Sequence, residues 1–122
     1  MSPRDIDVAR EGLVVVARLR GDIDMASIPA VSAHVLDALT MDVAGLVVDL
    51  TEVKYVDSAG VQMLFDLARR LEAGRQGMAL ALAADSPVRG LLRITSLDQA
   101  VAICTTYDDA MQSVFDGARR SY

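Results

Sequence analysis

The feature that most constrains this sequence is a short, unbroken aliphatic run, Leu13-Val14-Val15-Val16-Ala17. A strand that is apolar on both of its faces has to be covered on both faces, as happens in a sheet with helices packed on each side. The chain has 122 residues, which suits one domain, and it contains no Trp, two Phe and three Tyr. Its core must therefore be aliphatic, which fits a buried sheet between helices.

Five segments are predicted to be strands. The first two flank Glu11-Gly12, a turn signal, and so form an antiparallel hairpin. The last strand is short, so the sheet is expected to contain four to five strands. The predicted strands are Ile6–Arg10, Leu13–Arg20, Leu46–Leu50, Met78–Ala83 and Val101–Cys104.

Segments with helical spacing alternate with the later strands, and about four helices are expected. The first is predicted to start at Asp24, with Ser27 as the second choice of N-cap. Thr51–Val56 is interpreted as a loop that leads to a second helix, which is capped by Asp57-Ser58. The first two helices are predicted to bury Ile28, Val31, Val35, Leu36 and Leu39, and Val61, Leu64, Phe65, Ala68 and Leu71.

Two further helices complete the prediction, a short one opened by Asp85-Ser86-Pro87 and a final one over Tyr107–Phe115. The order of elements predicts an α/β fold whose mixed sheet begins with an antiparallel hairpin and then alternates strands and helices. We expect one domain over residues 5–117 and a short flexible tail over residues 118–122.

Charge and composition argue against several classes of partner. The net charge of -5 gives no basic surface for nucleic acid or for an anionic membrane. No apolar run approaches the ~20 residues of a membrane span, and no apolar signal stretch follows the N-terminus. The single cysteine allows no internal disulfide, so a cytoplasmic location is expected.

The sequence offers little catalytic chemistry. The one histidine, His34, lies between apolar positions of a predicted helix, where a structural or surface role is usual. Cys104 lies in an apolar strand and is interpreted as an inert core thiol, while Asp22 and Asp24 fit ordinary turn chemistry. No metal site, phosphate-binding loop or dinucleotide fingerprint is recognised, so we expect a non-enzyme without a cofactor.

The most informative segment is Val56-Asp57-Ser58-Ala59-Gly60-Val61, which follows a buried strand and opens a helix. Small residues after Ser58 leave its hydroxyl open to another protein, and the unpaired N–H groups of a helix start attract anions. A phosphoryl group on Ser58 adds about -1.5 to -2 charges, which the helix start tolerates and the neighbouring Asp57 repels. The segment therefore suits a phosphorylation switch, although Asp57-Ser58 before an apolar helix is also a plain N-cap and Gly60 could serve packing alone.

Together with Leu46-Val47-Val48-Asp49-Leu50, this segment resembles the signature of STAS domains, especially the bacterial anti-sigma factor antagonists. Gly21-Asp22-Ile23-Asp24 is similar to the family's segment before its first helix, and Ala84-Asp85-Ser86-Pro87-Val88 to its fourth-strand exit. The resemblance implies that the chain binds an anti-sigma factor, a serine kinase, and so releases a sigma factor. The kinase would phosphorylate Ser58 to end the interaction, and a phosphatase would restore it.

The same resemblance gives a candidate surface. Asp24 and Asp57 match positions at the family's kinase-binding surface, and Ser58 matches its phosphoacceptor. Met25 is interpreted either as a partner contact or as a partly buried packing residue. The expected partner-binding residues are Asp22, Asp24, Met25, Ser27, Asp57, Ala59, Gly60 and Val61.

Two alternatives stay open at this stage. The chain could be a STAS scaffold or subunit of a stress-signalling or lipid-transport complex, in which Ser58 is only a cap. A phospho-aspartate receiver or small enzyme fits less well, because the single lysine, Lys54, precedes the helix instead of following a late strand.

Overall fold

The computed structural model describes residues 5–120, and the side chains of residues 5–116. The described residues form a five-stranded sheet in the order β1-β2-β3-β4-β5. β1 (Ile6–Glu11) pairs with β2 (Val14–Ile23) in the antiparallel direction. Strands β3 (Gly45–Val56), β4 (Gly77–Ala81) and β5 (Ala102–Cys104) continue the sheet in parallel. This mixed sheet with an initial hairpin confirms the predicted fold class.

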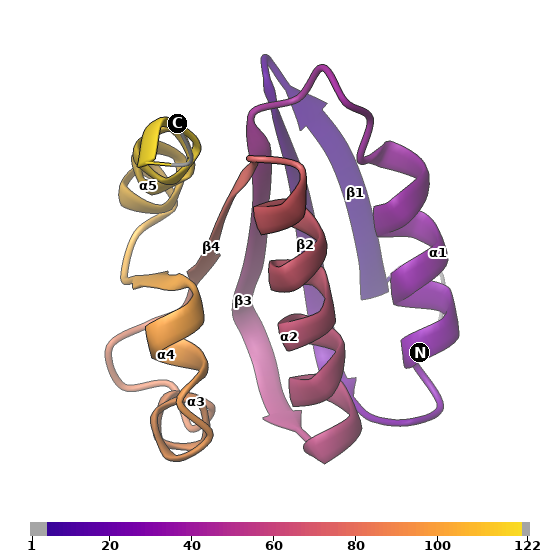
Figure 1. Cartoon of the computed structure of the whole chain (residues 1–122). Helices are drawn as coiled ribbons and strands as arrows, with labels where there is room; N and C mark the ends of the chain where they lie inside the picture. The colour runs from indigo at the N-terminus through magenta and orange to yellow at the C-terminus, as the bar shows by residue number, and fades with distance from the viewer. Residues whose placement is uncertain (1–4, 121–122) are drawn as a thin grey trace.

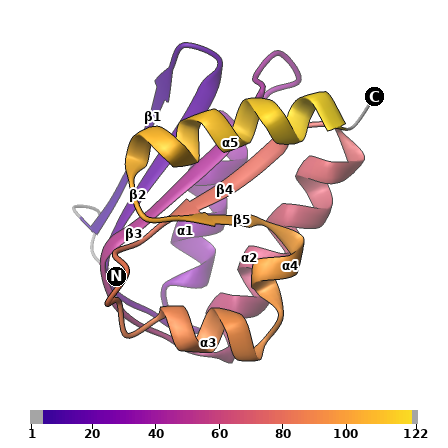
Figure 2. The same cartoon turned by 90° about the vertical axis from the view of Figure 1, so that its left-hand side faces the viewer.

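Helices cover both faces of the sheet (Figure 1). α1 (Ile28–Ala38) and α2 (Ser58–Ala73) lie side by side on one face. α5 (Tyr107–Arg120) crosses the opposite face, as Figure 2 shows. The short helices α3 (Arg89–Ile94) and α4 (Leu97–Ala100) lie near α2 and contribute Leu92 and Leu97 to the core on the α1–α2 face. The ends of the parallel strands that lead into α1 and α2 therefore meet at one edge of the sheet.

The aliphatic run of β2 divides between two buried clusters. Val15 and Ala17 belong to the large core beneath α1 and α2, whereas Val14 and Val16 belong to a smaller core beneath α5. All four side chains are completely buried. Alternation along a strand sends successive side chains to opposite faces, so a strand covered on both faces needs apolar residues throughout. Leu13, the first residue of the run, precedes β2 and stays half-exposed.

The predicted loop over Thr51–Val56 was wrong, because β3 continues to Val56. Arg20–Ile23 of β2 extends beside it, with register shifts between Arg18 and Arg20 and between Gly21 and Asp22. Val53 and Val56 are buried in the large core and hold this extension against the sheet. The irregular pairing breaks the simple alternation that identifies a strand in sequence.

Several helix boundaries also differ from the prediction. α1 begins at Ile28 with Ser27, not Asp24, at the N-cap position. The predicted third helix is two helices, separated by Ser96 in the left-handed conformation (φ 64°). α5 continues past the predicted end at Phe115 to Arg120, beyond the predicted domain boundary at residue 117. Residues 121 and 122 of the predicted tail lie outside the described residues.

The buried faces of α1 and α2 are shifted relative to the prediction. α2 buries Met63 and Leu67 in addition to Val61, whereas Phe65 is only half-buried. On α1, Leu36 was predicted to be buried and is 38% exposed. The wider apolar face of α2 arises because this helix contacts both the sheet and α1.

Candidate functional site

Ser58 is the first residue of α2 and follows directly on the end of β3. Its side chain is exposed, and the structure gives its hydroxyl no hydrogen-bond partner among residues 5–116. The next residue, Ala59, is half-exposed and carries only a methyl group. The serine hydroxyl is therefore open to solvent and to any protein that approaches the start of α2.

Asp57 fixes the position of this serine by joining two segments. Its Oδ1 accepts a hydrogen bond from the backbone N–H of Gly60 at 2.9 Å, which caps α2. Its Oδ2 accepts one from the N–H of Met25 at 3.1 Å, in the segment between β2 and α1. The backbone N–H of Asp57 also donates to the carbonyl of Ile23 at 3.0 Å. Both carboxylate oxygens are thus engaged within the protein.

The start of α2 is consequently less open to anions than the sequence suggested. One of its first N–H groups, that of Gly60, is already bound by Asp57, and the N–H of Val61 donates to the Asp57 carbonyl at 3.0 Å. The N–H groups of Ser58 and Ala59 remain as the helix's unpaired donors. A phosphoryl group on Ser58 would therefore meet these two donors on one side and the Asp57 carboxylate on the other.

Asp24 and Ser27 form a closed turn ahead of α1. Ser27 is 1% exposed, and its hydroxyl accepts from the N–H of Asp24 and donates to the carbonyl of Asp24, both at 2.9 Å. The Asp24 Oδ1 accepts in turn from the N–H of Ser27 at 3.1 Å. Ser27, which was predicted to be a partner-binding residue, therefore serves the fold, and its hydroxyl is not open at the surface.

Gly60 and Val61, which were also predicted to be partner-binding residues, are buried. A Cβ atom at Gly60 would lie 2.7 Å from Val56 Cγ1 and 3.0 Å from Ile23 Cγ2. Val61 is 5% exposed and packs in the large core. The missing side chain at Gly60 allows α2 to approach the ends of β2 and β3, which is what holds Ser58 at this edge.

Exposed residues at this edge of the sheet come from the ends of β2 and β3 and from the segment that follows β2. Met25 is 74% exposed, so its interpretation as a partly buried packing residue was wrong. Asp22 is exposed on β2 opposite Tyr55 of β3, which is 53% exposed. We call Asp22, Met25, Tyr55, Ser58 and Ala59 the Ser58 surface. Tyr55 was missed in the sequence, although an aromatic residue among the polar residues of Thr51–Tyr55 was a usable signal.

The other reactive side chains lie apart from one another. His34 is exposed on α1 with its Nδ1 2.7 Å from the Ala30 carbonyl oxygen. Cys104 is half-buried, with its Sγ 3.4 Å from Ser113 Oγ. Within the described chain, no three His, Cys, Asp or Glu side chains gather as they would around a metal ion. No helix in residues 5–120 combines the length and hydropathy needed to cross a membrane.

Solved structures with this fold include several anti-sigma factor antagonists. One from Mycobacterium paratuberculosis superposes with a TM-score of 0.79 at 26% identity, covering 93% of this chain and 97% of the other. The anti-sigma factor antagonist SpoIIAA in its unphosphorylated form gives 0.72 at 21% identity, covering 88% and 93%. The phosphorylated form of SpoIIAA, from Bacillus, gives 0.64 at 22% identity, covering 88% and 96%.

A different kind of protein shares the fold as well. A sulfate transporter family protein from Wolinella succinogenes gives a TM-score of 0.66 at 15% identity, covering 93% of this chain and 90% of the other. A search of curated protein sequences finds no match. The family model described as the STAS domain matches residues 5–110, which include all five strands and the Ser58 surface. The chain therefore belongs to the STAS domain family.

Proposed function

We propose that this chain is an anti-sigma factor antagonist of the bacterial cytoplasm. In its unphosphorylated form it binds an anti-sigma factor that is a serine kinase, and so releases a sigma factor. Phosphorylation of Ser58 by that kinase ends the binding, and a phosphatase restores it. The chain performs no catalysis in this cycle and needs no cofactor of its own, since the kinase supplies the bound ATP.

The observation that carries the proposal is the exposed, unpartnered hydroxyl of Ser58 at the start of α2. A kinase must bring the γ-phosphate of ATP in line with the attacking oxygen, which requires open space around the hydroxyl. The single methyl group of Ala59 leaves that space. The likeness to the antagonist from Mycobacterium paratuberculosis, at 26% identity over 93% of the chain, supports the same role.

The local charges explain how a phosphoryl group would act on the partner more than on the fold. A phosphoserine carries about -1.5 to -2 charges beside Asp57, whose carboxylate is already held by the N–H groups of Gly60 and Met25. Those two hydrogen bonds keep the first turn of α2 in place. The added charge and volume therefore project from the Ser58 surface and repel or displace a docked protein.

The test is to incubate the chain with a candidate kinase and ATP and to locate phosphate by mass spectrometry. We expect phosphate on Ser58 and none on Ser27, whose buried hydroxyl is the internal control. Ser58→Ala should keep kinase binding and lose phosphorylation. Ser58→Asp should weaken binding while circular dichroism stays unchanged, and an unfolded Ser58→Asp protein would contradict the local-charge mechanism.

The Ser58 surface can be tested separately from the phosphoacceptor. Asp22→Ala should weaken kinase binding without a change in stability, because Asp22 is exposed and the structure gives its carboxylate no partner among residues 5–116. Asp24→Ala is expected to weaken binding too, but it also removes the hydrogen bond to the Ser27 N–H, so its stability must be measured in parallel. If both variants bind the kinase as tightly as the unsubstituted chain does, these carboxylates do not belong to the interface.

The second candidate function is a STAS module that binds a membrane transporter or another complex without phosphorylation. The fold shared with a sulfate transporter family protein favours this possibility. In that case Ser58→Ala and Ser58→Asp should bind the partner equally well, and no kinase should modify the chain. The proposed switch predicts the opposite result for both measurements.

A further inference from the structure

We propose that the groove between α1 and α2 is a binding site for a fatty acid. This inference goes beyond the antagonist function, because it concerns a small ligand and does not require a kinase. The groove has a cavity volume of about 480 Å³ and is formed by the sides of the two helices that face away from the sheet and toward each other. Ligand sites in proteins commonly have volumes of about 300–1,000 Å³ and mostly apolar walls.

The floor of the groove and most of its walls are apolar. Met63 and Leu67 of α2 lie at its base, and Ile28 and Leu36 of α1 line the other side. Leu36 is 38% exposed although its spacing predicts a core residue, so the groove accounts for an apolar side chain that the protein itself leaves partly uncovered. An aliphatic chain placed here would bury the exposed part of Leu36 and of Met25, which stabilises the complex.

The groove is long enough for one extended chain. On α2 its lining runs from Ala59 to Arg70, and at 1.5 Å per residue these positions lie about 16 Å apart along the helix. On α1 it runs from Ile28 to Leu36 in the same direction, since both helices start at the same edge of the sheet (Figure 1). An extended chain of about 12 to 14 carbons, which advances about 1.3 Å per carbon–carbon bond, covers a similar distance.

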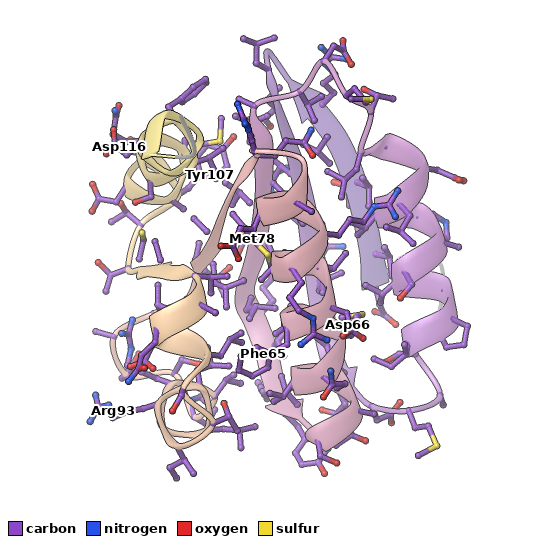
Figure 3. The ribbon with its side chains drawn as sticks, in the orientation of Figure 1. Phe65, Asp66, Met78, Arg93, Tyr107 and Asp116 are labelled. Atoms are coloured by element: carbon purple, nitrogen blue, oxygen red, sulfur yellow. The ribbon has the colours of Figure 1, made fainter. Side chains whose placement is uncertain are left out.

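The charges at the far end favour an anionic head group. Asp66, which Figure 3 shows on the side of α2 that faces α1, is already paired with Arg69 and accepts from Gln62. Arg70 also lines the groove, and its guanidinium has no ion-pair or hydrogen-bond partner within residues 5–116. A carboxylate at this end would pair with Arg70, while a cationic head group would meet an uncompensated positive charge.

The other end of the groove reaches the Ser58 surface. Ala59 and Met25 belong to the groove and to the Ser58 surface. A bound fatty acid would therefore cover two residues near the proposed phosphoacceptor. If the chain is the proposed antagonist, an occupied groove should therefore slow phosphorylation of Ser58. Binding itself can be measured without any kinase, so failure of this inference and failure of the proposed function are distinguishable.

The test is calorimetric titration of the full chain with octanoate, decanoate and dodecanoate below their micelle concentrations. We expect one site, and an affinity that rises roughly fifteenfold for each two added methylene groups, since each buried methylene contributes about 0.8 kcal/mol. Decylammonium, which has the same chain as decanoate with the opposite charge, should bind more weakly. Leu36→Glu, at the half-exposed wall, should abolish decanoate binding while the melting temperature stays near that of the unsubstituted chain.

Arg70→Gln should weaken the binding of decanoate about threefold to fivefold, which is the range that the loss of an exposed ion pair gives. The matched control is Arg93→Gln on α3, an exposed arginine away from the groove (Figure 3), which should leave the affinity unchanged. The proposal is overturned if no site is detected or if affinity does not depend on chain length. It is also overturned if decanoate and decylammonium bind alike, or if only a protein partner, and no fatty acid, protects the groove residues.

Discussion

Two serines at the starts of neighbouring helices differ in almost every physical respect. Ser27 precedes α1, is 1% exposed, and has its hydroxyl bonded to both the N–H and the carbonyl of Asp24. Ser58 begins α2, is exposed, and has no hydrogen-bond partner for its hydroxyl in the described part of the chain. Asp57 links the two helix starts, because it bonds the N–H groups of both Met25 and Gly60.

The difference shows that residue type and helix position do not by themselves make a serine available for modification. Ser27 completes a turn, so any reaction at its oxygen would first require the turn to open. Ser58 is held at the end of a rigid element while its own oxygen takes no part in holding it. Asp57 and Gly60 hold this part of the structure, which leaves the serine hydroxyl free for the regulatory role that we propose.

The largest effect is expected from Gly60→Ala, which tests whether close packing beneath Ser58 fixes its position. The new Cβ would lie 2.7 Å from Val56 Cγ1 and 3.1 Å from the Ile23 carbonyl oxygen. We expect a loss of about 2–3 kcal/mol in the free energy of unfolding, measured by urea denaturation. The matched control is Gly90→Ala on α3, where a Cβ would have no neighbour within 4 Å, and which should be neutral or slightly stabilising. Equal stability of the two variants would contradict this role of Gly60.

Ser27→Ala tests the buried half of the comparison and should have the next largest effect. The substitution leaves the N–H of Asp24 without its acceptor in a closely packed turn. A buried donor without a partner costs about 1–2 kcal/mol, which should appear as a lower urea midpoint with an unchanged slope. The comparison between the two serines fails if Ser27→Ala is no less stable than Ser58→Ala.

Asp57→Ala tests the link between the two helix starts. It removes the cap of α2 and the acceptor for Met25 together, and we expect a loss of about 1 kcal/mol in unfolding free energy. Amide hydrogen exchange should accelerate at Met25 and Gly60. Asp57→Asn keeps one oxygen acceptor. Its unfolding free energy and its exchange rates should therefore lie between those of the unsubstituted chain and those of Asp57→Ala. Exchange that changes only at Gly60 would show that the bridge to Met25 contributes nothing.

Much of the fold could be predicted because it depends on local patterns. The run Val14–Ala17 requires cover on both faces, and the turn at Glu11-Gly12 sets the hairpin. The extension of β3 over Thr51–Val56 could not be predicted in the same way, because its partner is the irregular end of β2. Register shifts of that kind depend on tertiary packing, which periodicity in one segment does not record.

The candidate site around Ser58 could be predicted from the sequence about as far as the fold could. The start of α2 at Asp57-Ser58 follows from capping preferences, which require only neighbouring residues. Capping preferences alone could not decide between Asp24 and Ser27 before α1, since both side chains suit an N-cap. The exposure of Met25 and the burial of Gly60 depend on how α2 sits on β2 and β3, which is a property of the packed structure.

Ser58→Ala should have the smallest effect on stability, and the proposed switch depends on this point. The hydroxyl makes no hydrogen bond to residues 5–116 and lies at the surface, so its removal should change the unfolding free energy by less than about 0.5 kcal/mol. Ser58→Asp places a negative charge at a helix N-terminus, where it is tolerated, although Asp57 opposes it. Both variants should therefore melt close to the unsubstituted chain, as followed by circular dichroism. A loss above about 1 kcal/mol in Ser58→Ala would mean that this oxygen supports the fold as Ser27 does, and phosphorylation would then have to act by unfolding the start of α2.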